Sequence, residues 1–250
     1  FQHAQVHLAA GFWPRVSISP PRDAGRTAGL GRPFAGGAGR RYDRGKVMTA
    51  EELEAGKTFG RYLDVDGDGI PYRTLPATHP NKGAYFTRGT TRNAYAKYSE
   101  VGSDYIYNME RLRRKQDTAR TLVPAPVLHA ASQPTRYGVI HYGSASPPMA
   151  EALALMEAEG VHVDALRVRG FPFSAEVDAF IEAHDLVFVV EQNESAQLRQ
   201  LLINEGDLNP KKLVRVLHHD GTPITARFIA GAVAEVIDDR KVQPIAKVMS

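Results

Sequence analysis

The fold is decided by LVFVVEQN, residues 186–193, a nearly unbroken apolar run that ends in polar residues. A strand with apolar side chains on both faces must be covered on both faces, which is typical of parallel sheets packed between helices. Parallel strands need crossover connections, and these are usually helices. The stretch therefore predicts helical patterns on either side of it.

The flanking sequence has this alternation from residue 134 to residue 240. Predicted strands lie at 136–144, 161–169, 186–193 and 213–221, and predicted helices lie at 147–160, 174–185, 195–206 and 222–238. Strands that alternate with helices favour an α/β domain with right-handed crossovers. We predict a four-unit parallel sheet with helices on both faces, followed by a tail at 241–250.

Ligands of open parallel sheets bind beyond the carboxyl ends of the strands. Those ends are predicted at Gly143–Ser146, Arg169–Ser174, Glu191–Glu194 and His218–Thr222. The alternative is that these segments are turns and helix caps, since Ser174 and Ser195 stand where a capping residue belongs.

Two sequence patterns at these strand ends resemble a serine nucleophile and a histidine metal site, but their residue spacing fits neither. A nucleophile elbow has the motif G-x-S-x-G, with serine two residues after the first glycine. In YGSASPP, Ala145 stands two residues after Gly143, so a serine hydrolase is not indicated. His218 and His219 are neighbours on a predicted strand and face opposite sides, so they do not share a metal ion easily. We predict no metal site.

Residues 41–133 are predicted to form a connector with a long ordered loop. The sequence TAEELEAG starts a short helix at 49–56, in which Thr49 and Glu52 have the capping-box spacing. A glycine- and proline-rich loop follows at 60–93.

A second connector helix is predicted at 104–122, with Ser103 as its cap. Ile106, Met109 and Leu112 give this helix an apolar side. Its basic run RLRRK, residues 111–115, either meets an anionic partner or forms a solvated helix face, and the solvated face is the more common arrangement.

The stretch DVDGDGIPYRTL, residues 64–75, begins like a calcium-binding EF-hand loop. Asp64, Asp66 and Asp68 occupy the first three ligand positions, and Gly69 follows as required. Leu75 stands where the closing bidentate carboxylate belongs, so we interpret the aspartates as turn formers.

The first 40 residues differ in composition from the rest of the chain. They are rich in Gly, Ala, Pro and Arg and have no sustained hydrophobic period. Such a segment buries too little apolar surface to offset its ordering entropy. We expect a disordered or mis-framed segment at 1–40, with a transit peptide or basic arm as the alternative.

The basic character of the chain comes from its first part. Residues 1–46 contain seven Arg and one Lys against two Asp, a net charge of +6, whereas the whole chain carries +3 and the remainder therefore −3. A mildly acidic folded part does not indicate a nucleic-acid partner.

No apolar run approaches the roughly 20 residues that a membrane span needs, so we predict no membrane partner. The chain has no cysteine, which excludes a cysteine-ligated iron–sulfur cluster on this chain. A cysteine-free chain fits a reducing compartment, and we predict a cytoplasmic location.

A set of motifs in order, from about Arg41 to about Ile237, resembles a known family. The motifs are RYDRGKVMTAEELE, GRYLDVDGDGIPYRTLP, THPNKGAYFTRGT, NMERLRRK, VPAPV, HVDALRVRGFPF, VFVVEQN and HHDGTPITARFI. Together they resemble the C-terminal part of the alpha subunit of bacterial and archaeal 2-oxoacid:ferredoxin oxidoreductases, most closely the 2-oxoglutarate type.

The resemblance implies an enzyme that converts 2-oxoglutarate and coenzyme A to succinyl-CoA and CO2 and reduces ferredoxin. It implies a transketolase C-terminal-like fold for 134–240 and a beta subunit as partner, with ferredoxin and coenzyme A engaged through the complex. Thiamine diphosphate, magnesium and the iron–sulfur cluster would lie on the beta subunit or a missing domain, and none would be bound by this chain alone.

The motifs of the family's pyrimidine-binding domain, Y-P-I-T-P and G-G-P-S-T-G, do not occur in these residues. The resemblance therefore assigns no catalytic and no cofactor-binding residue here. It implies a truncated alpha subunit that contributes the assembly domain and is inactive alone. The alternative is a stand-alone α/β protein-interaction module without an enzymatic role.

Three cations of the connector loop, Arg73, Lys82 and Arg88, are the candidate site residues. Guanidinium and ammonium groups could neutralise an anionic substrate, coenzyme A or an acidic surface of a partner. The alternative is that they are solvated surface residues.

Overall fold

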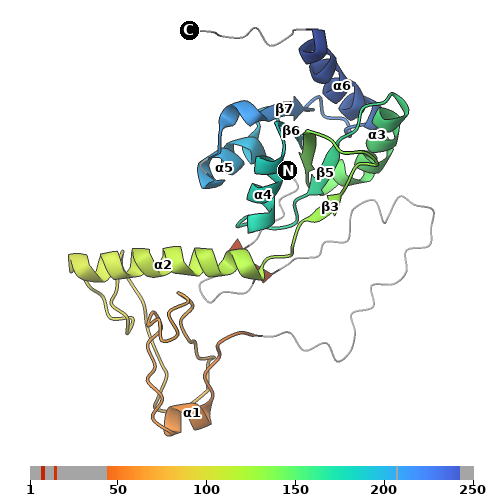
Figure 1. Cartoon of the computed structure of the whole chain (residues 1–250). Helices are drawn as coiled ribbons and strands as arrows, with labels where there is room; N and C mark the ends of the chain where they lie inside the picture. Colours follow the sequence, from red (N-terminus) through yellow and green to blue (C-terminus); the bar gives the residue numbers. More distant parts are fainter. Residues whose placement is uncertain (1–6, 9–13, 16–43, 207, 243–250) are drawn as a thin grey trace, which may run out of the picture. The chain divides into compact units, whose positions relative to one another are not determined.

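A computed structural model of the chain describes residues 7–8, 14–15, 44–206 and 208–242. The chain divides between Leu122 and Val123 into two compact units. We call the described residues up to Leu122 the loop–helix unit and those from Val123 onward the sheet unit. Each unit is described by itself (Figure 1).

The sheet unit contains a five-stranded sheet with the order β3-β5-β4-β6-β7. Its strands are β3 (Val127–His129), β4 (Tyr137–His141), β5 (Asp164–Arg167), β6 (Leu186–Glu191) and β7 (Leu213–Leu217). The last four are mutually parallel, whereas β3 pairs antiparallel with β5. The predicted α/β class and the four parallel strands are confirmed.

Strand β6 is the centre of this sheet, as its sequence indicates. All six of its residues are buried. It pairs with β4 on one side, where Val139 lies opposite Phe188, and with β7 on the other, where Val190 lies opposite Val216. The alternation of side chains along β6 sends Phe188 into one core and Val189 into the other.

Four helices cover the two faces of the sheet. They are α3 (Ser146–Ala158), α4 (Ala175–Ala183), α5 (Gln197–Gly206) and α6 (Ala226–Val242). One core contains side chains of α3 and α6, such as Met156 and Ile229. The other contains side chains of α4 and α5, such as Ile181 and Leu202. Helices on both faces were predicted and are confirmed (Figure 1).

Strand β3 was not predicted. It has only three residues and directly follows Pro126, so it is too short to show an alternating sequence pattern. The predicted connector, 41–133, contains this strand. At the other end, α6 runs to Val242 and so includes the first residues of the predicted tail, whereas 243–250 lie outside the described residues.

The loop–helix unit consists of α1 (Ala50–Glu54), a long loop and α2 (Gly102–Leu122). The capping box is present, because Thr49 Oγ1 accepts a hydrogen bond from Glu52 N and Glu52 Oε2 accepts one from Thr49 N. The predicted cap Ser103 is wrong. Helix α2 begins earlier, and the Val101 carbonyl accepts from the amides of Asp104 and Tyr105.

In the first 40 residues, only β1 (His7–Leu8) and β2 (Pro14–Arg15) are described, and they pair antiparallel. The rest of the predicted disordered or mis-framed segment lies outside the described residues. No helix of the described ranges combines the length and the apolar composition that a bilayer crossing requires.

Candidate functional site

The loop–helix unit contains a pocket of about 260 Å³. Its walls come from three loop segments and from one side of α2. The lining residues are Arg61, Tyr62, Pro71, Thr90, Thr91, Arg92, Tyr105, Asn108, Met109, Arg111, Leu112 and Lys115. Four of these are Lys or Arg, and none of these lining residues is acidic.

The loop reaches this position because it passes very close to the α2 backbone at Gly69. Gly69 has φ +77°, and a Cβ placed on it would lie 2.2 Å from Lys115 N and 2.6 Å from Arg111 O. Arg111 Nη1 donates to the Gly69 carbonyl at 3.0 Å. Thr118 Oγ1 donates to the carbonyl of Asp68 at 2.6 Å.

A second set of bonds attaches the loop to α2 one turn earlier. The Tyr107 hydroxyl accepts from Asp64 N at 2.9 Å and donates to the Tyr62 carbonyl at 3.1 Å. Asp64 accepts from Arg114 Nε at 3.1 Å and from Gly69 N at 3.0 Å. These bonds fix the segment that carries Tyr62 to the helix that carries Arg111 and Lys115.

The ring of Tyr62 lies among three guanidinium groups. The Cζ atoms of Arg61, Arg92 and Arg111 are 5.5, 5.3 and 5.7 Å from its centroid. The electron-rich face of an aromatic ring attracts a cation at such distances, more strongly where water is excluded. Arg61 and Arg111 are each only 5% exposed.

Burial is unusual for positive charges, and it changes the titration of Lys115 and Arg111. Burial lowers the pKa of Lys115 from 10.5 to about 8, with further contributions from the charges of Arg111 and Arg61. Burial likewise lowers the pKa of Arg111, although an arginine stays protonated in proteins. The pocket therefore stays strongly positive at neutral pH.

Several polar atoms at the pocket are buried without a partner among the described residues. They are Arg92 Nε, Arg111 Nε and Asn108 Oδ1. A buried donor without an acceptor is costly, about 1–3 kcal/mol and more if charged. Two of these atoms, Arg92 Nε and Arg111 Nε, are guanidinium donors that lack an acceptor among the described residues.

The solvated-face interpretation of RLRRK holds only for part of the run. Arg113 is exposed, but Arg111 is buried, Arg114 pairs with Asp64, and Lys115 lines the pocket. The apolar side of α2 is instead the exposed one, since Ile106, Met109 and Leu112 are 58%, 50% and 45% exposed.

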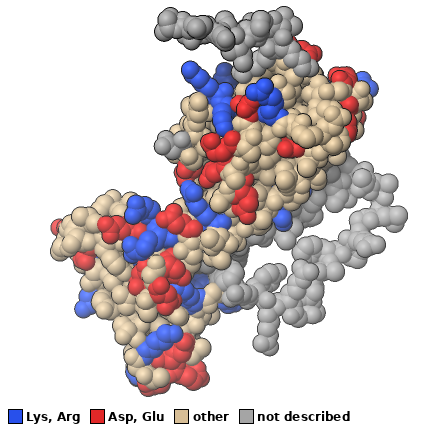
Figure 2. All heavy atoms as spheres, viewed as in Figure 1, with Lys and Arg blue, Asp and Glu red and all other residues tan. Residues whose placement is uncertain are grey.

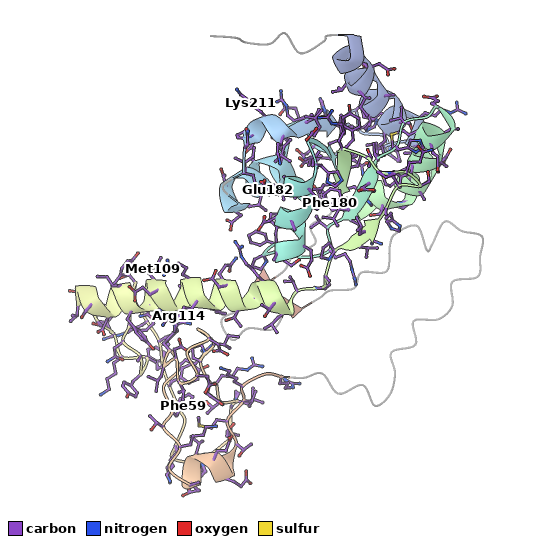
Figure 3. The ribbon with its side chains drawn as sticks, in the orientation of Figure 1. Phe59, Met109, Arg114, Phe180, Glu182 and Lys211 are labelled. Carbon is purple, nitrogen blue, oxygen red and sulfur yellow. The ribbon has the colours of Figure 1, made fainter. Side chains whose placement is uncertain are left out.

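In Figure 3, Arg114 lies on the side of α2 toward the loop. The spacing contains a signal for this arrangement. Tyr107, Arg111 and Lys115 recur every fourth residue and therefore share one helix face. In this helix the face that packs on the loop is polar.

The aspartates of DVDGDG form turns and ion pairs. Lys46 Nζ lies 2.6 Å from both Asp66 Oδ2 and Asp68 Oδ2. Asp68 Oδ1 also accepts from Ile70 N at 2.9 Å. Hydrogen bonds with Lys46 lower the pKa of Asp66. Basic and acidic side chains accordingly lie side by side over this unit in the lower left of Figure 2.

The three predicted loop cations lie apart from the pocket lining. Arg73 is half-buried, and its Nη2 donates to the Arg44 carbonyl at 2.9 Å. Lys82 pairs with Glu54 at 2.8 Å. Arg88 is exposed. Their role as anion contacts stays a prediction.

At the carboxyl end of β6, Glu191 has a structural role that the sequence did not reveal. Its carboxylate is buried and accepts from Leu198 N at 2.7 Å and Arg199 N at 3.0 Å, at the start of α5. Asn193 Oδ1 accepts from Gln197 N at 3.2 Å. The predicted cap Ser195 is wrong, because its hydroxyl donates to Glu194 instead.

The end of β4 places a serine beside a histidine. Ser146 Oγ lies 3.3 Å from His141 Nδ1, and Nε2 of that ring is buried without a partner among the described residues. Burial lowers the pKa of His141 from 6.5 to about 4, with smaller contributions from Arg167 and His129. A base this weak accepts a proton poorly at neutral pH, and no carboxylate of the described residues hydrogen-bonds the ring.

The donor groups for a metal ion are dispersed. Within the described residues, no group of three or more His, Cys, Asp or Glu side chains could hold an ion. His218 Nε2 lies 3.5 Å from Asp220, and its ring packs edge-on against Phe228 at 4.9 Å. These residues do not fit a magnesium site, and the sequence has no cysteine to ligate iron.

No family model matches the chain. Over 115 residues, 45% of this chain, it is 31% identical to the 2-oxoacid:ferredoxin oxidoreductase 2 alpha subunit of Aeropyrum pernix. The match covers 17% of that protein, so the chain spans less than a fifth of the length of this curated relative.

The fold has a counterpart among solved structures. It is similar to the 2-oxoglutarate:ferredoxin oxidoreductase from Magnetococcus marinus, solved with 2-oxoglutarate, coenzyme A and succinyl-CoA bound. The TM-score is 0.63 at 22% identity, over 72% of this chain and 31% of that chain. At this identity the similarity establishes the fold. The sequence match, over less than half of the chain, makes that part a homologue at partial coverage of the alpha subunit of a 2-oxoacid:ferredoxin oxidoreductase.

Proposed function

We propose that the chain forms the C-terminal region of the alpha subunit in a thiamine diphosphate-dependent 2-oxoacid:ferredoxin oxidoreductase. In the whole complex, 2-oxoglutarate and coenzyme A would be converted to succinyl-CoA and CO2, with reduction of ferredoxin. The observation that carries this proposal is the 31% identity over 115 residues to a named alpha subunit. The shared fold over 72% of the chain supports it.

The role proposed for this chain is assembly rather than catalysis. Its described residues include no constellation suited to magnesium, and a cysteine-ligated cluster cannot form on a chain without cysteine. We therefore place thiamine diphosphate, magnesium and the iron–sulfur cluster on the beta subunit or on another part of the complex. When bound there, the thiamine group supplies the decarboxylation chemistry.

Co-expression with the beta subunit of a 2-oxoglutarate:ferredoxin oxidoreductase tests the assembly role. We expect the chain to co-elute with the beta subunit in size-exclusion chromatography, in a complex that carries iron–sulfur absorbance. We expect the chain alone to show no coenzyme A-dependent reduction of a viologen dye by 2-oxoglutarate. Elution of the two chains in separate peaks would contradict the proposal and favour a stand-alone interaction module.

We further propose Arg73, Lys82 and Arg88 as loop contacts for an anionic group in the complex, from the substrate, coenzyme A or a partner's surface. Arg88 is exposed and available for such a contact. The substitution Arg73→Glu in the alpha–beta complex should raise KM or weaken assembly. Unchanged KM, kcat and subunit stoichiometry would show that Arg73 has no such role.

A further inference from the structure

We propose that the pocket between the connector loop and α2 is a binding site for a small molecule that carries a phosphate group. The site consists of Arg61, Arg92, Arg111 and Lys115 around the ring of Tyr62. All of these residues belong to the loop–helix unit, and the site needs no partner subunit to bind its ligand.

The charged residues that line the pocket are all positive. Four cationic side chains line one pocket of about 260 Å³, and no lining residue among those described is acidic. On the adjoining loop, the Asp64 carboxylate accepts from Arg114 Nε and from Gly69 N. Like charges held this close repel one another, and a bound dianion would remove that cost.

Two guanidinium groups at the pocket each have a donor without a partner among the described residues. Arg111 is 5% exposed and uses Nη1 to bond the Gly69 carbonyl, whereas its Nε is buried without a partner among the described residues. Arg92 has the same pattern, because Nη2 donates to the Gly89 carbonyl and Nε has no partner in the described part of the chain. A phosphate has several acceptor oxygens in the geometry that guanidinium groups match.

The size and the lining of the pocket favour a ligand with an apolar part. Its other walls are apolar or aromatic and come from Pro71, Tyr105, Met109 and Leu112. A bare phosphate ion would leave these walls uncovered, whereas an attached organic group would bury them. A phosphate monoester with a compact apolar part fits both the charge and the lining.

Lys115 gives the site a measurable pH dependence. The charges of Arg111 and Arg61 act on its ammonium group, and Arg92, Tyr62 and Tyr105 also line the pocket. Burial and these charges favour loss of its proton as pH rises through about 8. A phosphate dianion beside Lys115 favours the protonated form, so binding and protonation reinforce each other.

The test is isothermal titration calorimetry of the 250-residue chain with phenyl phosphate, inorganic phosphate and phenol. Phenyl phosphate should bind most tightly, and inorganic phosphate more weakly. Phenol should show no binding at the same concentrations. Between pH 7 and pH 9 the affinity for phenyl phosphate should fall about tenfold, because Lys115 loses its proton.

Variants separate a built site from general electrostatics. Lys115→Gln should weaken phenyl phosphate binding about tenfold at pH 7, and Lys115→Arg should keep it and remove the decline at pH 9. Arg113→Gln is the matched control, because Arg113 lies on the same helix, is exposed and does not line the pocket. It should leave the affinity within about twofold.

Two results would overturn the proposal. One is the absence of heat or saturation with either phosphate compound at millimolar concentration, in a chain whose circular dichroism shows that it is folded. The other is an equal loss of affinity in Arg113→Gln and Lys115→Gln, because binding would then follow net charge rather than the pocket.

Discussion

Gly69 illustrates how one residue determines the local structure of the loop–helix unit. In the sequence, Gly69 stands at the sixth position of a calcium-like loop, where glycine permits a sharp turn. In the structure there are two reasons why this position requires glycine. Its φ is positive, and a Cβ placed on it would clash with the α2 backbone. Gly67 has the same φ of +77°, but nothing lies within 4 Å of its hypothetical Cβ.

These two glycines provide a matched pair of substitutions. Gly67→Ala should lower the free energy of unfolding by about 1 kcal/mol, the strain of a side chain at positive φ. Gly69→Ala should cost at least about 3 kcal/mol, because it adds a backbone clash to that strain. Urea denaturation monitored by circular dichroism measures both, and equal losses would contradict the close approach.

His141 should make the stability of the sheet unit depend on pH. Its pKa is lowered to about 4 by burial, against 6.5 in an unfolded chain, so the unfolded state binds the proton more tightly. Stability should be fully present above about pH 6.5 and should fall by roughly 3 kcal/mol as pH decreases toward 4.

The variant His141→Gln carries no titrating ring and isolates this effect. Its stability should change less than that of the original chain between pH 6.5 and pH 4, as measured by chemical denaturation at several pH values. Parallel pH profiles for the two proteins would exclude His141 as the source.

At the scale of elements, the start of α5 depends on a carboxylate that belongs to β6. Glu191 accepts two amide hydrogen bonds from the first turn of α5 and one bond from Asn193 Nδ2 at 2.8 Å. A carboxylate at this end of a helix also interacts favourably with the helix dipole. The strand and the helix that follows it are therefore joined by more than their connecting loop.

Glu191→Gln should destabilise the sheet unit by about 1–3 kcal/mol, because the amide group presents one acceptor oxygen and a donor that faces other donors. Glu194→Gln is the control, since Glu194 is exposed and bonds only the neighbouring Ser195 hydroxyl among the contacts described. Thermal unfolding followed by circular dichroism compares the two. A similar midpoint for both variants would argue against the capping role.

Elements with strong periodicity were predictable and elements whose packing is polar were not. The run at β6 and its flanking amphipathic helices identified the sheet, because apolar burial is the main determinant of that unit. Helix α2 was found, but its packing face was not. A hydrophobicity pattern cannot show that Arg111 is buried against a loop carbonyl rather than exposed to solvent.

The candidate site was missed for the same reason. The predicted site residues are Arg73, Lys82 and Arg88, which lie in the connector loop. The pocket instead collects Arg61 and Arg92 from the loop and Arg111 and Lys115 from the helix. These residues are up to 54 positions apart in the sequence, from Arg61 to Lys115, and only the tertiary structure brings them together.

At the scale of the whole molecule, the sheet unit contains both hydrophobic cores. Their buried residues run from Val139 to Ile237, and all belong to the unit that begins at Val123. Residues 123–250 expressed alone should therefore unfold in a single cooperative transition with an α/β circular dichroism spectrum. A gradual, non-cooperative transition would show that the sheet unit depends on the loop–helix unit.

The antiparallel strand β3 has a consequence for how the sheet meets other molecules. A strand at the border of a sheet exposes unpaired backbone groups that can recruit a strand from another chain, which is a route to aggregation. Strand β3 occupies the border beside β5, spans only Val127–His129, and follows Pro124 and Pro126. Proline cannot donate to an added strand, so this border is a poor template for fibrillar growth.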